Sequence, residues 1–329
     1  MSDGGDGFGE VFGRMLGARP KSIRTENAAH ERCLADWWWE SETKTAVIES
    51  ANVIGLAMLP AKRFHPFELD TFGLGLVLKA IAERNPHRCL VGIGGSATND
   101  GGFGLARALG WGFLDRAGNP IESWTGLVDL DSVVRPKRRV QFKEITVATD
   151  VQNPLLGPRG ATRIYGPQKG LSPGQIPNAE SCLRRLARVV SREFGHDSAR
   201  LAGSGAAGGL GFGLVTFAGA RILPGFDLFA QQARLERRLR DAQLVITGEG
   251  RLDKSSLMGK GVGQIAYRCR QLGITCIGLA GSVELGQAVL KTFAEISALS
   301  SLTSSSEARS HPGIWLERLA HKVAMHWAE

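Results

Sequence analysis

The segment RCLVGIGGSATNDGGFGLARALG, residues 88–110, decides the fold because it has the pattern of a strand, a loop and a helix. The apolar run Cys89–Ile93 predicts a buried strand, and a helix is predicted from about Gly102 to Leu109. Loops that follow the parallel strands of an open α/β sheet collect at one edge, where ligands bind. The segment therefore predicts an α/β fold with a functional site at the carboxyl edge of a sheet.

Further strands are predicted along the chain. One ends at Asp150 in ITVATDVQNPLLG, and another, Leu244–Ile246, is followed at once by a polar loop. Residues 275–282 and 295–302 have the pattern of two more buried strands, and the helix before them has Gly273 as its C-cap. Helices that alternate with short apolar runs predict a parallel sheet in the C-terminal part of the chain.

A different pattern covers residues 21–59. Here Trp37–Trp39 and Thr45–Ile48 predict the two arms of a β-hairpin that turns near residues 41–42. Three adjacent tryptophans indicate a strand covered on both faces more often than a ligand cage. We therefore expect two α/β units, of which the middle one contains hairpins and a mixed sheet.

Composition excludes several classes of protein. The 329 residues are 43% hydrophobic and 22% charged, which is ordinary for a globular protein, and 43 of them are glycine. No apolar run reaches the ~18 residues of a membrane helix, and the first residues lack the basic and apolar regions of a secretory signal, so none is expected. The five cysteines are scattered and odd in number, which favours reduced thiols in a cytoplasmic protein.

The net charge of +8 leaves nucleic-acid binding open as an interpretation. However, the arginines of residues 184–192 are spaced as the polar face of a helix whose other face is apolar, with Leu183, Leu186, Val189 and Val190. Basic and aromatic residues do not interleave as they would in a stacking platform. We therefore expect neither nucleic acid nor membrane as a partner, and the oligomeric state cannot be predicted.

The loop of residues 94–102 has the chemistry of an anion site. Its glycines, among them Gly94, Gly95 and Gly101, let the backbone approach an anion, and a helix N-terminus follows. The side chains that can donate hydrogen bonds are those of Ser96, Thr98 and Asn99. Asp100 would repel phosphate, so it is expected to hold a metal ion or to accept a substrate proton. A plain helix N-cap is the alternative, although it explains only one polar residue.

Two later segments carry similar chemistry. Asp150 and Asn153 follow one predicted strand, and Gln168 and Lys169 lie between glycines a short way on, where Lys169 could reach a phosphate or be an ordinary surface charge. In residues 247–261, TGEGRLDKSSLMGKG, Glu249 and Asp253 are candidate magnesium ligands. Around Gly250, Arg251 and Lys260 are expected to face phosphoryl oxygens, the alternative being a solvated turn with internal ion pairs.

Common nucleotide and metal signatures are absent from the sequence. It has no Walker loop, and the G-x-G-x-x-G match at residues 203–208 does not follow a predicted strand, so a tight loop before a helix at residues 210–220 is expected instead. The histidines show no metal-ligand spacing. The residues alone therefore predict magnesium-dependent chemistry on a small ligand that carries phosphate.

Taken together, the segments resemble those of the bacterial glycerate kinase family, type I class. The resemblance rests on IGGSATNDGG (93–102), DVQNPLLGPRGATRIYGPQKG (150–170), GSGAAGGLGFGL (203–214) and TGEGRLDKSSLMGKG (247–261), in the family's order. SDGGDG (2–7) is similar to the family's Asp-Gly-Gly-Glu-Gly segment and adds Asp3, Gly4 and Gly5 to the expected binding residues. The family's usual first strand and Asp-Ser-Phe-Lys-like loop do not precede it, and we expect that translation starts upstream of Met1.

The resemblance implies ATP-dependent phosphorylation of D-glycerate, with ATP and Mg²⁺. It also implies a flavodoxin-like parallel domain, residues 1–20 and 240–329, interrupted by a larger inserted mixed α/β domain, residues 21–239, with the active site between them. Asp100, Asp150, Lys169 and Arg251 are the expected catalytic residues. ELDTFGLGLVL (68–78) departs from the family's Thr-rich stretch and retains Thr71, Gly73 and Gly75. The alternative function is an inactive paralogue that binds glycerate or nucleotide as a sensor or partner module.

Overall fold

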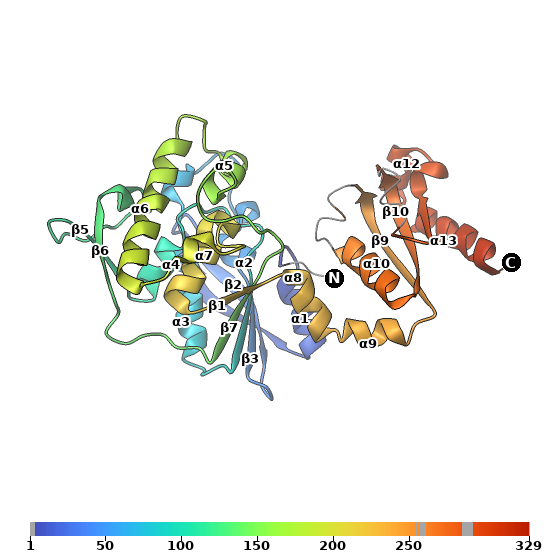
Figure 1. Ribbon diagram of the computed structural model, residues 1–329, viewed down its shortest axis with the longest axis horizontal. Coiled ribbons are helices and arrows are strands. Elements are labelled where there is room, and N and C mark those ends of the chain that lie inside the picture. The colour runs from blue at the N-terminus through green and yellow to red at the C-terminus, as the bar shows by residue number, and fades with distance from the viewer. Residues whose placement is uncertain (1–3, 254–255, 257–260, 285–291, 329) are drawn as a thin grey trace. The chain divides into compact units, whose positions relative to one another are not determined.

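The chain forms two compact units in the computed structural model, which describes residues 4–253, 256, 261–284 and 292–328 (Figure 1). The N-terminal unit spans residues 2–228 and the C-terminal unit residues 229–329. Each unit has its own sheet, mixed in the first and parallel in the second, with helices packed on it. The predicted α/β fold class is confirmed.

The sheet of the N-terminal unit has six strands in the order β1-β2-β3-β4-β7-β8. They are β1 (Arg19–Glu26), β2 (Arg32–Glu40), β3 (Thr45–Glu49), β4 (Arg88–Gly92), β7 (Glu144–Ala148) and β8 (Arg221–Leu223). The pairs β1–β2 and β2–β3 are antiparallel, whereas β3, β4, β7 and β8 are parallel neighbours. A separate hairpin joins β5 (Gly112–Asp115) to β6 (Leu130–Val134). The carboxyl ends of the parallel strands therefore share one edge of the sheet.

The predicted tryptophan hairpin is present, and strand β2 is covered on both faces. Trp38 packs under helix α1 (Phe8–Leu16), where a Cβ atom added to Gly9 or Gly13 would lie 1.9 or 2.4 Å from its indole ring. Trp37, on the opposite face, belongs to the main core. Successive side chains of a strand point to opposite faces, so the adjacent tryptophans pack against helix α1 on one face of the sheet and against the core on the other.

Helix α1 also has a polar attachment to the N-terminal unit. The carboxylate of Glu49, at the end of β3, accepts hydrogen bonds from the backbone N–H groups of Gly7 and Gly9, both at 2.9 Å. A carboxylate at this end of a helix is stabilised by the helix dipole. The structure thus groups residues 4–20 with the N-terminal unit, unlike the predicted division, and the boundary lies after residue 228 rather than 239. A flavodoxin-like assignment for the C-terminal unit stays a prediction.

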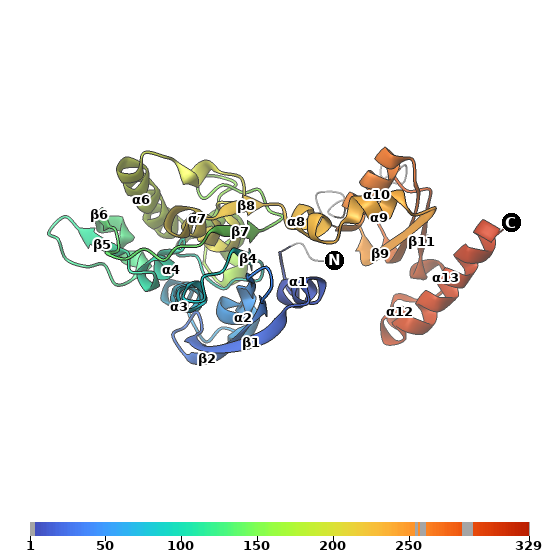
Figure 2. The same cartoon turned by 90° about the horizontal axis from the view of Figure 1, so that it is seen from below.

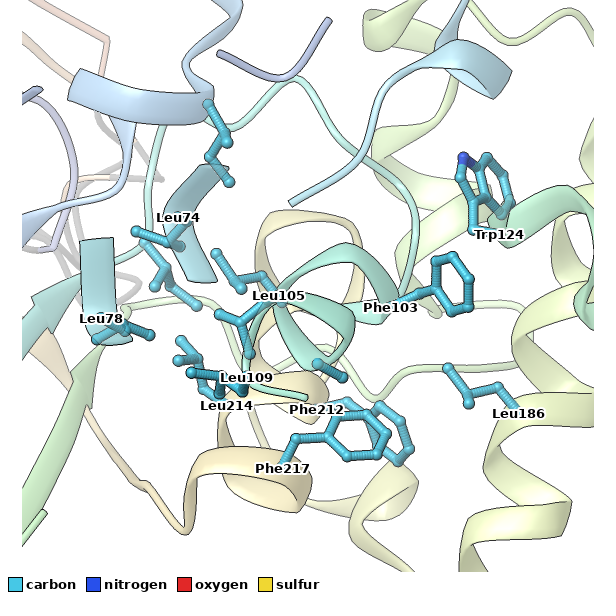
Figure 3. Packing of buried hydrophobic residues seen from close by; sticks show 14 of the residues in the cluster. Leu74, Leu78, Phe103, Leu105, Leu109, Trp124, Leu186, Phe212, Leu214 and Phe217 are labelled. Atoms are coloured by element: carbon cyan, nitrogen blue, oxygen red, sulfur yellow. The ribbon is translucent and has the colours of Figure 1, made fainter. Parts of the chain in front are cut away.

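Helices of the N-terminal unit pack around a large apolar core, shown in Figure 3. They are α2 (Ala51–Ile54), α3 (Phe72–Ala82), α4 (Phe103–Ala108), α5 (Ala161–Tyr165), α6 (Ile176–Phe194) and α7 (Ala206–Ala218), followed by α8 (Gly225–Gln232). Helix α4 approaches α7 closely because Gly102 meets Gly213, where a Cβ atom on Gly102 would lie 2.6 Å from the Gly213 Cα. The predicted apolar face of α6 is buried, as expected.

The C-terminal unit has a parallel sheet, as predicted, and its strands lie in the order β11-β10-β9. Its strands are β9 (Leu244–Leu252), β10 (Thr275–Val283) and β11 (Glu295–Ala298), and its helices include α9 (Leu235–Arg240), α10 (Gly261–Leu272), α12 (Ser305–Ser310) and α13 (Pro312–Ala328). Figure 2 shows α10 on one side of this sheet and α12 and α13 on the other. Gly273 has φ of 70° after α10, which confirms the predicted C-cap.

Strand β9 is longer than predicted. The predicted strand Leu244–Ile246 continues through Gly248 and Glu249 to Leu252, because these residues pair in parallel register with β10, for example Glu249 with Ala280. Pairing with a neighbouring strand outweighs the low strand propensity of glycine and charged residues. The expected loop of residues 247–253 is therefore mostly strand.

No helix within the described ranges is long and apolar enough to cross a membrane. The five cysteines are free thiols.

Candidate active site

A pocket of about 560 Å³ lies at the carboxyl ends of strands β3, β4 and β7. Its walls come from six short segments and from Tyr165: residues 4–6, 51–57, 93–96, 149–151, 168–169 and 206–207 contribute lining residues. Ligands of open α/β sheets bind at this edge. Of the predicted site residues, eight line this pocket: Gly4, Gly5, Gly94, Gly95, Ser96, Asp150, Gln168 and Lys169.

Residues 4–6 approach residues 93–96 and Ala148 so closely that glycine is required at Gly4 and Gly94. The N–H of Gly94 donates to the Gly4 carbonyl at 2.8 Å, and a Cβ atom on Gly94 would lie 2.5 Å from the Gly5 Cα. Gly4 has φ of +95°, and its added Cβ would lie 2.4 Å from the Ala148 carbonyl oxygen. Backbone therefore forms this wall of the pocket, and backbone groups can approach an anion more closely than a side-chain wall allows.

Lys169 is the cation of the pocket. It ends a short 3₁₀ helix, Pro167–Lys169, and its side chain is buried. The Nζ atom donates a hydrogen bond of 2.5 Å to the Thr98 carbonyl. Burial lowers the pKa of this lysine to about 7, and the negative charge of Asp100 opposes the shift. A buried ammonium with so low a pKa is stabilised when an anion binds beside it. The interpretation of Lys169 as an ordinary surface charge is therefore wrong.

Asp100 lies beneath the pocket rather than in its wall. Its side chain is fully buried, and one oxygen, Oδ2, accepts hydrogen bonds from the Thr71 N–H at 3.0 Å, the Thr71 hydroxyl at 2.7 Å and the Gly104 N–H at 2.9 Å. Burial raises its pKa to about 6, Asp70 adds to this, and the hydrogen bonds from Gly104 and Thr71 act against it. These contacts favour a positioning role for Asp100, which differs from the catalytic role expected from sequence.

The other polar residues of the loop after β4 make hydrogen bonds inside the protein, although the Oδ1 atom of Asn99 is buried without a partner among the described residues. Ser96 lines the pocket, and its hydroxyl lies 2.9 Å from that of Thr98. The amide nitrogen of Asn99 donates to the Thr162 hydroxyl at 3.0 Å, and the Gly101 N–H donates to the Gly208 carbonyl at 3.1 Å. Thr98, Asn99 and Gly101 thus hold the loop in shape and do not line the pocket.

Asp150 follows β7 and lines the pocket directly. Its Oδ1 atom accepts a hydrogen bond from the Phe226 N–H at 3.2 Å. Asn153 is displaced from the pocket, but its Oδ1 accepts a hydrogen bond of 2.7 Å from the hydroxyl of Tyr165, which does line the pocket. Burial raises the pKa of Tyr165. Asn153 therefore acts on the pocket through the tyrosine that it orients.

The remaining predicted residues lie in the C-terminal unit or outside the described residues. Glu249, Gly250 and Arg251 line a second pocket, contained in the C-terminal unit. The Arg251 guanidinium hydrogen-bonds to Glu284 and lies 3.8 Å from the carboxylate of Asp253. Asp3 and Lys260 fall outside the described residues. Within the described ranges no three His, Cys, Asp or Glu side chains gather as a metal site.

Comparison with known proteins decides the family. The model of the glycerate kinase family matches residues 1–328. The chain belongs to this family. It is 36% identical over 335 residues to the glycerate kinase of Halalkalibacterium halodurans, covering 99% of this chain and 87% of that protein. It is 37% identical over 291 residues to the glycerate 2-kinase of Escherichia coli, covering 86% of this chain and 75% of the relative.

A solved structure agrees with this assignment to the glycerate kinase family. A crystal structure assigned as glycerate kinase 2 from Salmonella typhimurium LT2 superposes with a TM-score of 0.79 at 34% identity, covering 91% of this chain and 79% of that one. The resemblance drawn from the sequence segments is confirmed.

Within this family framework, the residues retained at the Thr-rich stretch have structural explanations. Thr71 donates to Asp100, as described above, and accepts a hydrogen bond of 2.8 Å from the Leu105 N–H. A Cβ atom on Gly73 would lie 1.8 Å from the Glu26 carbonyl oxygen, and one on Gly75 would lie 2.6 Å from the Ala108 Cβ. These three residues fit α3 against its neighbours, which is a reason for their retention that does not involve substrate.

Sequence reasoning missed the other residues of the pocket lining, among them Asp6, Tyr165 and Ala207. Tyr165 lay within a quoted segment but was not selected, because a tyrosine gives no signal of its own there. Ala207 lines the pocket with φ of +55°. A left-handed alanine costs conformational energy and marks a constrained site, and its signal in the sequence was limited to the glycines around it.

Proposed function

We propose that the protein is a cytoplasmic kinase that transfers a phosphoryl group from ATP to D-glycerate with the help of Mg²⁺. Membership of the glycerate kinase family and the names of the relatives support glycerate as the acceptor. The observation that carries the proposal for the chemistry is the buried ammonium of Lys169 in a pocket walled by glycine backbone. Such a site favours an anion that carries several negative oxygens.

Each polar residue of the pocket has a separate role in the proposed reaction. Lys169 stabilises the negative charge that spreads over the oxygens of the transferred phosphoryl group. Asp150 lies in the same pocket and accepts the proton of the attacking hydroxyl. The glycerate oxygen then bonds to phosphorus while the bond to the ADP oxygen breaks. Backbone N–H groups of the loop after β4 and the side chain of Gln168 hold the acceptor in line.

The carboxylate that fits a magnesium ion is that of Asp6, because it lines the pocket in which Asp150 serves as the base. Magnesium is commonly held by one or two carboxylates together with the phosphates of its nucleotide, so one is enough. Bound there, the ion neutralises phosphate charge. Glu249 and Asp253 fit this role less well, since Asp253 is close to the guanidinium of Arg251.

A coupled assay of ADP release tests the proposal on the purified full chain. D-glycerate is compared with L-glycerate and with other hydroxy acids, with and without magnesium. We expect ADP release that depends on both magnesium and D-glycerate. ³¹P NMR of the product identifies which hydroxyl is phosphorylated. Absence of ADP release with every acceptor, from protein that is folded by circular dichroism, would support the inactive paralogue instead.

A further inference from the structure

The C-terminal unit contains a pocket of about 680 Å³. One wall is the carboxyl-terminal half of β9 and β10, and the other comes from Leu299, α12 and the start of α13. This volume is in the range of sites that take drug-sized ligands. The position at the carboxyl ends of parallel strands is again the edge where α/β sheets bind ligands. Its volume and position therefore make it a candidate ligand site.

The wall away from the strands is mainly apolar, with Leu299, Ala308 and Leu316, and Leu279 of β10 adds to the apolar lining. Leu316 is 47% exposed even though it is a large apolar side chain. An apolar wall of this kind stabilises a flat aromatic ring by removing both surfaces from water. A small acid such as glycerate has no such surface to bury.

The polar residues of the pocket complement a ligand that has both donors and negative charge. The Oε1 atom of Glu249 is buried and has no hydrogen-bond partner among the described residues, although its side chain lines the pocket. A buried carboxylate oxygen without a donor is costly, so a ligand O–H or N–H group would be bound strongly here. Arg309 lines the same pocket, and no acidic partner is described for it. Arg251, on the strand beside Glu249, adds a second guanidinium.

We propose that this pocket binds the nucleoside of ATP, with the purine against the apolar wall and a ribose hydroxyl donating to Glu249. The inference rests on the proposed function, because it takes ATP as the phosphoryl donor. Arg309 and Arg251 attract the phosphate chain. An acidic side chain that accepts a hydrogen bond from a ribose hydroxyl is a common feature of nucleotide sites on α/β sheets. Glu249 is then a nucleoside-binding residue rather than a metal ligand.

Two variants of the full chain test this assignment by calorimetric titration with ADP. Glu249→Gln keeps the size of the side chain and removes its charge, and we expect the Kd for ADP to rise about 10-fold or more, the effect of one charge-assisted hydrogen bond. The Kd for D-glycerate should not change. Glu307→Gln is the matched control, because Glu307 is exposed on α12, pairs with His311 and does not line the pocket.

Hydrogen exchange of the unmodified protein gives a result that does not depend on how a variant folds. We expect ADP to slow exchange in residues 244–252 and 299–316, and D-glycerate to slow it in residues 94–102. If ADP protects residues 94–102 and leaves the C-terminal segments unchanged, the nucleoside pocket is assigned to the wrong unit, although kinase activity still stands. If no ADP is bound or released with D-glycerate, the proposed function itself has failed.

Discussion

The loop after β4, residues 94–102, and the end of β9, residues 247–253, have similar compositions but are built differently. Both combine glycines with acids and hydrogen-bonding side chains. In the loop after β4, Asp100 is fully buried and its carboxylate is held by backbone and hydroxyl donors. At the end of β9, Arg251 lies near Asp253 and Glu284, and all three side chains are substantially exposed.

This difference separates polar residues that shape a site from those that are available to a ligand. Exposed ion pairs contribute little to stability, because water screens both charges. Buried hydrogen-bonded groups contribute more, because a buried donor that loses its acceptor is costly. We therefore expect changes near residues 94–102 to affect folding or catalysis strongly, and changes at residues 247–253 to act chiefly through ligand binding.

The largest effect is expected for Lys169, whose ammonium group contacts the loop after β4. Lys169→Met should lower kcat at least ~10²-fold, because the pocket loses the positive charge that stabilises the transferred phosphoryl group. The melting temperature should hold or rise, since burial of this ammonium already lowers its pKa to about 7. Steady-state kinetics and thermal unfolding of the same sample measure both quantities.

Lys79→Met is the control for that variant, because Lys79 is an exposed lysine on α3. It should keep normal turnover. Near-normal turnover of Lys169→Met would remove the buried cation from the mechanism, and the loop after β4 would then be a structural feature only.

A comparison of two aspartates separates positioning from catalysis. Asp100→Asn should lower the free energy of unfolding by about 2–3 kcal/mol, because an amide oxygen cannot serve the donors of Thr71 and Gly104 as a carboxylate does. Asp150→Asn should change stability little and reduce kcat, because Asp150 lines the pocket. Urea unfolding and kinetics on both variants test this. A stable but inactive Asp100→Asn protein would return Asp100 to the catalytic role expected from sequence.

The sequence predicted the elements of the fold better than the direction of side chains. The strand, loop and helix of residues 88–110 and the hairpin of the three tryptophans could be predicted from local patterns. Asp100 could not be placed, because its partner Thr71 comes from a distant segment. The extension of β9 could not be predicted either, since it depends on pairing with β10. Local sequence patterns predict which residues lie at the edge of the sheet. Contacts between distant segments determine which of those side chains line the pocket.

Stability is expected to depend on pH at His30, which pairs with Asp70, a neighbour of Asp100. His30 lies 2.7 Å from Glu26 and 3.3 Å from Asp70, and the hydrogen bond to Asp70 is the main reason that its pKa rises to about 9. The folded pKa is above the unfolded value of about 6.5, so this contribution to stability is complete below pH 6.5 and is lost as the pH rises through about 9.

His30→Asn should reduce that loss of stability between pH 6.5 and 9. Asparagine tolerates the left-handed backbone of this position, where φ is +59°. The difference in unfolding free energy between the variant and the parent protein, measured at several pH values, isolates His30 from other titrating groups. A difference that stays constant with pH would show that Asp70 does not stabilise the charged imidazole.

The smallest effect is expected at the end of β9. The side-chain oxygen of Asp253 lies 3.8 Å from Arg251, whose side chain is 57% exposed, so Asp253→Asn should change the unfolding free energy by less than about 0.5 kcal/mol. We also expect turnover and the magnesium requirement to stay within about twofold, because loss of one carboxylate charge outside the metal site removes no ligand of the ion. A magnesium titration of the ADP-release assay, repeated with Asp6→Asn, measures this, and Asp6→Asn should shift the magnesium requirement upward. If Asp253→Asn instead lowers turnover ~10²-fold and raises the magnesium requirement, Asp253 is a metal ligand as the sequence suggested, and the end of β9 belongs to the catalytic centre.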